Sequence, residues 1–226
     1  HADFFGGGLY SEGLSATVVT SSSIANNTAD QDGGGLWLST SIPSLIERSL
    51  ISGNTSSGDR GGGIYSQGGL SIVESSIIDN GARTGGGLAQ AGGDNPLTIE
   101  DSTFSGNNAL DGGGASLDHL GLTTITQATF SGNTANRDGG GLLVERGSPQ
   151  LNHSTFSQNT AGNASTLEGS GGGIRVFIGA TPDLSHTIVG DNIDHSGLAP
   201  DVSANPHPVT LEDPVDLSYS LIGDTT

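Results

Sequence analysis

Seven Gly-Gly-Gly triplets recur along the chain, and their spacing restricts the folds that it can adopt. The triplets begin at Gly6, Gly33, Gly61, Gly85, Gly112, Gly139 and Gly171. Successive triplets lie 27, 28, 24, 27, 27 and 32 residues apart. A period of roughly 20–50 residues is typical of solenoids, propellers and other arrays that are built from one recurring unit.

A second signature recurs in phase with the triplets and ends on asparagine. These asparagines are Asn27, Asn54, Asn80, Asn107, Asn133 and Asn159, and a degenerate copy ends at Asp191. Between the two signatures lie short runs of strand-forming residues, such as Leu36–Leu38 and Leu97–Ile99, which are separated by Gly, Pro and Asn. Runs this short predict strands, because a helix needs a longer periodic segment.

Three short strands in each repeat predict one coil of a parallel β-helix. Each strand would pair with its equivalent in the next coil, about 4.8 Å away. A propeller blade needs about 40–45 residues, and a leucine-rich repeat needs a Leu-rich consensus, which this chain lacks. We therefore expect an all-β, single-stranded parallel β-helix with seven to eight coils of about 27 residues. The coils should occupy residues 1–190, and residues 191–226 should form a degenerate last coil with a Pro-rich loop or cap.

Stacking of equivalent residues accounts for the side chains that recur. One inward apolar column is expected to contain Ile24, Ile51, Ile77, Phe104, Phe130, Phe156 and Ile188. A second is expected to contain Leu9, Leu36, Ile64, Leu88, Ala115, Leu142 and Ile174. The recurring asparagines should stack at a bend and exchange amide hydrogen bonds along the axis, as in other cross-β stacks. The glycine triplets suit a tight corner where coils approach too closely for a Cβ atom.

Composition excludes several classes of protein. The chain has no Cys, so it can form neither disulfides nor thiolate metal sites. The net charge is −18, and the six basic residues are all Arg, which leaves no basic patch for nucleic acid or anionic membranes. No apolar run approaches the roughly 18–20 residues that span a bilayer. The chain begins at His1, so we expect a processed form or a fragment of an exported bacterial protein.

Two motifs carry a resemblance to a known family. The segments Gly-Gly-Gly-Ile-Tyr and Phe-Ser-Gly-Asn resemble the paired Gly-Gly-Ala and Phe-x-x-Asn repeats of polymorphic outer-membrane proteins. They are also similar to the right-handed β-helix repeats of large bacterial surface proteins, and the chain end from Thr187 to Asp224 resembles choice-of-anchor surface proteins. The resemblance covers nearly the whole chain. It implies a right-handed β-helix that is extracellular or surface-associated, without shared catalytic residues.

The strongest candidate for a binding surface is aromatic. Tyr10, Trp37 and Tyr65 each lie two residues after a triplet, where alternation points them outward. On neighbouring coils they would form a flat exposed strip, which could stack on sugar rings or anchor a protein partner. The alternative is that the three rings stack on one another and only stabilise the sheet.

A candidate metal site is acidic. Glu47, Glu74 and Glu100 recur as a possible ladder, and stacked carboxylates would favour a hard cation such as Ca²⁺. Two further groups of acidic residues are candidates: the first recurs at the triplets, and the second, at the chain end, would form another Ca²⁺ site. The first group is Asp32, Asp59, Asp111 and Asp138, and the second is Asp191, Asp194 and Asp201. The alternative is a solvated acidic edge, partly offset by arginines. No cofactor is required by this interpretation.

We predict a non-catalytic cell-surface scaffold or adhesin-like binding module, whose partner is a cell-envelope protein or a glycan. The aromatic strip and a loop over Ala161–Ser170 would bind the partner. Because His1–Phe5 is too short to cap a solenoid, the chain is also expected to suit a larger envelope assembly.

The alternative is a polysaccharide-active enzyme, either a lyase or a glycoside hydrolase. Lyases of this fold use Lys or Arg bases, whereas this chain has no Lys and scattered arginines. Five of the six histidines lie at unrelated phases of the repeat and predict no catalytic group. They are His119, His153, His186, His195 and His207.

Overall fold

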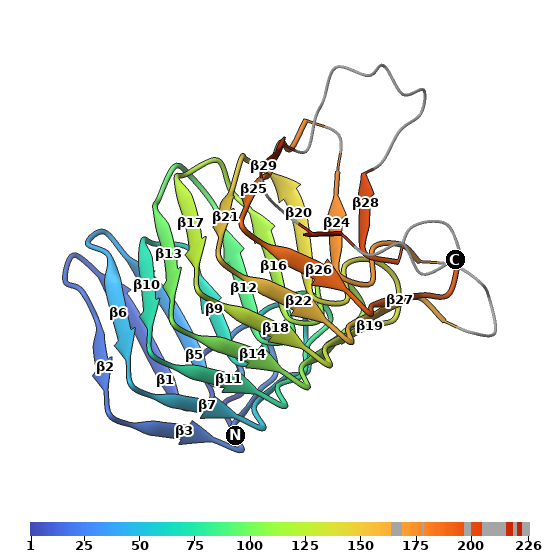
Figure 1. Ribbon diagram of the computed structural model, residues 1–226. Coiled ribbons are helices and arrows are strands. Elements are labelled where there is room, and N and C mark those ends of the chain that lie inside the picture. The colour runs from blue at the N-terminus through green and yellow to red at the C-terminus, as the bar shows by residue number, and fades with distance from the viewer. Residues whose placement is uncertain (164–168, 178, 197–199, 205–215, 219–220, 223–226) are drawn as a thin grey trace.

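Parallel strands stack into a solenoid in the computed structural model, which describes residues 1–163, 169–177, 179–196, 200–204, 216–218 and 221–222 (Figure 1). The described residues contain thirty strands and no helix. Three sheets of eight parallel strands run along the axis, one strand from each sheet in every coil. The prediction of an all-β, single-stranded parallel β-helix is therefore confirmed.

The first sheet contains the strands that follow the glycine triplets, together with the last strand β28. These strands are β1 (Leu9–Gly13), β5 (Leu36–Thr40), β9 (Ile64–Ser66), β12 (Leu88–Ala91), β16 (Ala115–Asp118), β20 (Leu142–Arg146), β24 (Ile174–Val176) and β28 (Val202–Ala204). The second sheet contains β2 (Val18–Thr20), β6 (Ser44–Glu47), β10 (Leu70–Val73), β13 (Leu97–Glu100), β17 (Thr123–Thr126), β21 (Gln150–Asn152), β25 (Asp183–Ser185) and β29 (Asp216–Ser218).

The third sheet precedes the asparagine bend. It contains β3 (Ser23–Ala25), β7 (Leu50–Ser52), β11 (Ser76–Ile78), β14 (Thr103–Ser105), β18 (Thr129–Ser131), β22 (Thr155–Ser157), β26 (Ile188–Gly190) and β30 (Leu221–Ile222). Most coils add a short fourth strand after the bend, beyond the three that the sequence predicts. These strands are β4 (Thr28–Ala29), β8 (Thr55–Ser56), β15 (Asn108–Ala109), β19 (Thr134–Ala135), β23 (Thr160–Ala161) and β27 (Ile193–Asp194).

The core consists of columns of identical or similar side chains along the axis. Phe104, Phe130 and Phe156 are fully buried and stack with ring centroids 4.7 Å apart. The predicted continuation through Ile188 is wrong, because Val189 lies opposite Phe156 and Ile188 is 48% exposed. The insertion in this coil obscures the repeat, and a shift of one residue moves a side chain to the other face of a strand.

The asparagine column lies at the bend after the third sheet. Asn54, Asn80, Asn107, Asn133 and Asn159 are at most 1% exposed. Each donates from Nδ2 to the Oδ1 atom of the next asparagine along the axis at 2.9–3.0 Å, and Asn27 does the same from a half-buried position. The column continues at Asn192 rather than at the predicted Asp191, and ends where Asp201 Oδ1 accepts from Asn192 Nδ2 at 2.9 Å.

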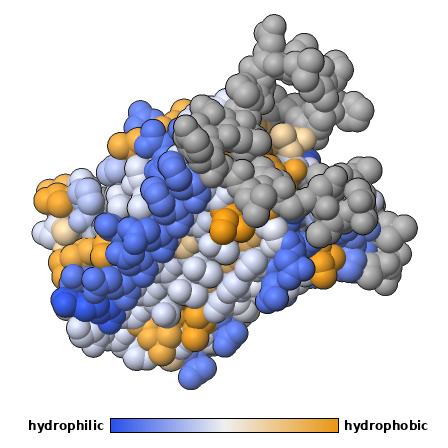
Figure 2. All heavy atoms as spheres, viewed as in Figure 1, coloured by the Kyte–Doolittle hydropathy of each residue, from blue (hydrophilic) through white to orange (hydrophobic). Residues whose placement is uncertain are grey.

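A hydrophilic band runs along the axis where the chain turns from the second sheet to the third (Figure 2). The residues at this turn are exposed and have positive φ angles near 50°. They are Arg48, Glu74, Asp101, Gln127, His153 and His186. His153 and His186 stack in parallel at 4.7 Å, so the prediction that the histidines are unrelated in phase is wrong for this pair.

The last segment continues the solenoid. Strands β27, β28, β29 and β30 each extend a sheet of the preceding coils. Residues 205–215, where most of the Pro-rich loop was predicted, lie outside the described residues. In the predicted loop at 161–170, Ala161 belongs to β23 and residues 164–168 lie outside the described residues.

Candidate functional site

One outward column of the first sheet brings together the predicted aromatic strip and a charged pocket that the sequence analysis did not predict. The strand register places its members opposite one another from coil to coil. They are Tyr10, Trp37, Tyr65, Ala89, Ser116, Leu143, Arg175 and Ser203. The aromatic residues lie at one end of this column, and the pocket lies around its later members.

The aromatic residues stack, but they do not form the predicted flat exposed strip. The rings of Tyr10 and Trp37 are 4.6 Å apart, and those of Trp37 and Tyr65 are 6.2 Å apart. Tyr10 is 47% exposed, whereas Trp37 and Tyr65 are only 7% and 4% exposed. Phe5 packs against Trp37 at 5.4 Å, and Ala89 lies beside Tyr65 in the buried cluster. The expectation of exposure is therefore wrong for two of the three rings, because neighbouring side chains cover them.

The middle of the column consists of small side chains, which leave space on the outer surface. Ala89, Ala91 and Ser116 are at most 5% exposed and form the floor of this region. Beyond them, the register between β16 and β20 shifts, so that Asp118 lies opposite Arg146 and Glu145 is an extra residue. Such a bulge redirects side chains. Here Glu145 Oε1 accepts a hydrogen bond from Ser116 Oγ at 3.0 Å.

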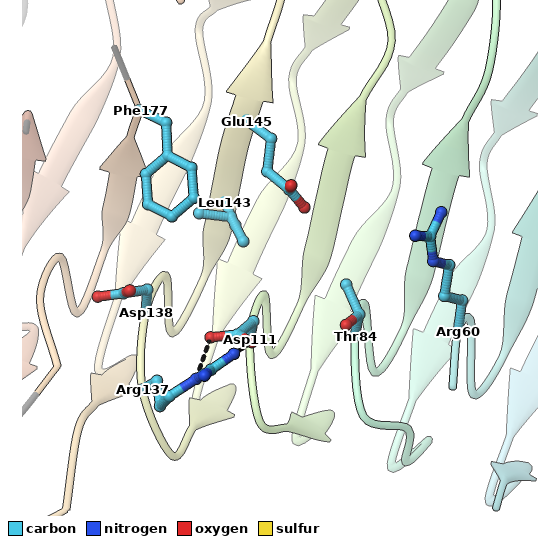
Figure 3. A pocket seen from close by; sticks show the side chains of 8 residues that line it. All are labelled: Arg60, Thr84, Asp111, Arg137, Asp138, Leu143, Glu145 and Phe177. Atoms are coloured by element: carbon cyan, nitrogen blue, oxygen red, sulfur yellow. Dashed lines mark hydrogen bonds and ion pairs between the residues drawn. The ribbon is translucent and has the colours of Figure 1, made fainter. Parts of the chain in front are cut away.

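A pocket of about 320 Å³ opens beside Leu143 (Figure 3). It is lined by Arg60, Thr84, Asp111, Arg137, Asp138, Leu143, Glu145 and Phe177. Figure 3 shows Leu143 among Phe177, Glu145, Asp138 and Asp111, so a buried apolar side chain is surrounded by carboxylates.

Two carboxylates of the pocket lie beside arginines. Arg137 makes two hydrogen bonds to Asp111, one of them from Nε at 3.0 Å. Asp138 Oδ1 accepts from the backbone N–H of Ser170 at 3.0 Å and lies 3.8 Å from Arg175 Nε. The side chain of Arg175 is 10% exposed, and its Nε atom makes no hydrogen bond.

Burial raises the pKa of the Asp138 carboxyl group above 3.8 and that of Glu145 above 4.5. The folded state therefore holds these protons more tightly than the unfolded state, and stability falls as the pH rises through the raised pKa values. We expect the melting temperature to be about 1–3 °C higher at about pH 5 than at pH 7. Thermal unfolding followed by circular dichroism measures this. A double variant, Asp138→Asn with Glu145→Gln, should have a smaller pH dependence. A wild-type melting temperature that rises toward pH 7 would contradict the assignment.

The predicted glutamate ladder is wrong. Glu47 and Glu100 both lie opposite Val73, and Glu74 is the next residue, at the turn. Glu47, Glu74 and Glu100 are almost evenly spaced in the sequence, but Glu74 lies one residue beyond the position that pairs with the other two.

The carboxylates at the triplets do not form one continuous column. Arg60 and Thr84 lie between Asp32 and Asp111 in the corner column. In the part of the chain that the structure describes, the sole group of His, Asp and Glu side chains compact enough for a metal ion is His1, Asp3 and Asp30, all exposed. Neither predicted Ca²⁺ site is assembled among these residues.

The sequence contains only a weak signal of the pocket. Asp111 and Asp138 were noted because they precede their triplets. Glu145 lines the pocket because of the bulge, and Phe177 lines it from the neighbouring coil. Neither follows from the spacing of the repeat.

Comparison with known protein families agrees with this geometry. A family model described as the right-handed β-helix region matches residues 2–126, which is more than half of the chain. The chain belongs to the right-handed β-helix family. A second model, the Chlamydia polymorphic membrane protein repeat, matches residues 127–145 of this β-helix. Searches of curated proteins and of solved structures found no match. Within the described residues, the β-helix has no helix that is long and apolar enough to cross a membrane.

Proposed function

We propose that this β-helix is a non-catalytic, surface-associated module of the bacterial cell envelope that binds an envelope protein or a glycan through the outer face of its first sheet. The match of residues 127–145 to a polymorphic membrane protein repeat supports surface association. The observation that carries the proposal of binding is the single outward column, which joins an exposed aromatic ring to a polar pocket.

A rigid backbone makes such a face suitable for recognition. Apart from the end strands β1 and β28, the column rests on strands that are paired on both sides, above a core whose members are almost all fully buried. Exposed aromatic rings contribute much of the binding energy in many interfaces. At the aromatic end, Tyr10 presents its ring while Trp37 supports it from the next coil. A partner would meet a surface that needs little reorganisation, which favours affinity.

Tyr10→Ala tests this function. We expect the variant to bind isolated bacterial envelope fractions and glycan arrays at least tenfold more weakly than the wild-type protein, because a hot-spot aromatic residue is worth about 2 kcal/mol or more. The matched control is Leu50→Ala, since Leu50 is also apolar and 36% exposed but lies on the third sheet. Equal binding by the wild type and both variants would overturn the assignment of this face.

A polysaccharide-active enzyme is the second candidate, and one observation favours it. Asp138 and Glu145 line the same pocket, and burial raises the pKa of both carboxyl groups. A carboxyl group with a raised pKa and a second carboxylate are the chemical groups of glycosidases. Release of reducing ends from neutral polysaccharides, abolished by Glu145→Gln, would support hydrolysis. Absence of released ends while binding persists would leave the non-catalytic module.

A further inference from the structure

The arginines at the pocket already have carboxylate neighbours. Arg137 is held by Asp111, and the Nε atom of Arg175 lies 3.8 Å from Asp138. The Nε atom of Arg60 lies 3.4 Å from the Oδ2 atom of Asp59. A negatively charged ligand would have to compete with these carboxylates for each guanidinium group. It would also approach the carboxylates that line the pocket, in a chain whose net charge is −18.

The carboxylates retain capacity to accept hydrogen bonds. Glu145 accepts from Ser116, and Asp138 accepts from the backbone of Ser170. An ionised carboxylate has two oxygens with about four acceptor positions, so each group can accept further hydrogen bonds from a ligand. The pocket therefore suits a ligand that donates several hydrogen bonds and carries no negative charge.

The apolar part of the pocket consists of Leu143 and Phe177. Leu143 lies between the carboxylates, with Phe177 beside it (Figure 3). Leu143 is only 2% exposed, so the accessible apolar surface comes from the half-buried Phe177. The guanidinium carbon of Arg175 lies 5.5 Å from the centroid of the Phe177 ring. The Nε atom of Arg175 is buried and without a hydrogen bond, so Arg175 supports Phe177 and Asp138 from behind the pocket. A ring with an apolar face and hydroxyl groups at its edge would pack on Phe177 while its hydroxyl groups reach Glu145 and Asp138.

We propose that this pocket binds one pyranose ring of a neutral saccharide, packed on Phe177, with hydroxyl groups donating to Glu145 and Asp138. The volume of about 320 Å³ lies at the lower end of the range for small-molecule pockets, roughly 300–1,000 Å³. The proposal deepens the proposed function, on which it rests, by naming the class of glycan and the position where it binds. It predicts discrimination against uronic acids.

Isothermal titration calorimetry tests the pocket with matched probes, namely tetrasaccharides of glucose, mannose and galactose, and a galacturonate tetrasaccharide. At least one neutral tetrasaccharide should bind ten times more tightly than the galacturonate probe. Phe177→Ala and Glu145→Gln should each weaken that binding at least tenfold. Glu100→Gln, an exposed carboxylate on the second sheet, should leave it unchanged. Circular dichroism and the melting temperature establish whether each variant is folded. If Phe177→Ala unfolds, Glu145→Gln still tests the pocket, because it preserves the shape of the side chain.

The two proposals fail in different ways. If no neutral tetrasaccharide binds, if the galacturonate probe binds equally well, or if neither pocket variant weakens binding, the pocket assignment is overturned. Envelope binding that still depends on Tyr10 would then leave the proposed function intact. Saccharide binding that responds to the pocket variants, without any envelope binding, would overturn the surface role and support the pocket.

Discussion

Asn107→Leu is expected to lower the free energy of unfolding by about 3–5 kcal/mol, because it interrupts the asparagine column in the middle of the solenoid. The Asn107 side chain donates from Nδ2 to Ile77 O and Asn133 Oδ1, both at 2.9 Å. Its Oδ1 atom accepts from the backbone N–H and the Nδ2 group of Asn80, both at 3.0 Å. A leucine of similar volume would leave the buried backbone N–H of Asn80 without an acceptor, which is more costly than the loss of a solvated hydrogen bond.

The measurement is equilibrium unfolding in urea, followed by far-ultraviolet circular dichroism. Asn27→Leu is the control, because Asn27 is half-buried and its amide donates a single hydrogen bond, to Asn54 Oδ1 at 3.0 Å. We expect Asn27→Leu to lower the free energy of unfolding by about 1 kcal/mol. If both variants lost a similar free energy of unfolding, burial within the column would add nothing to the loss of a single hydrogen bond.

Gly113→Ala is expected to destabilise the fold by about 3 kcal/mol or more, since the new methyl group has no space. A Cβ atom at Gly113 would lie 2.5 Å from both Gly140 O and Thr134 O. These carbonyl groups belong to the backbone of the next coil. Gly113 itself donates to Gly139 O at 2.9 Å, so the clash cannot be relieved without separating paired coils.

Gly132→Asn is the matched control for this variant. Gly132 has a φ angle of +63° and no atom within 4 Å of a Cβ position. Other residues of the same column already adopt this conformation with side chains, namely Asn26, Asp79 and Gln158, at φ angles of 55–57°. We therefore expect Gly132→Asn to change the melting temperature by less than about 2 °C. A larger loss in Gly132→Asn than in Gly113→Ala would contradict this account of the triplet.

Several features of the candidate site could not be predicted from the repeat, and each has a physical reason. Ile188 and Glu74 were placed one position from their true columns, because spacing alone does not reveal a shift of one residue. Trp37 was expected to be exposed because alternation points it outward, which it does. Its burial depends on Phe5 and Tyr10, whose positions are set by packing on the outer face.

By itself, the sequence determined that this chain is a parallel β-helix and which residues share most of its inner columns. Equivalent residues at a constant period must stack when each strand pairs with its counterpart, so inward positions follow from spacing and alternation. Only the tertiary structure decided which outward residues are buried and where the pocket lies. On the outer face, the burial of a residue depends on the size of the side chains in neighbouring columns, and the position of the pocket depends on the bulge at Glu145. Neither is periodic in the sequence.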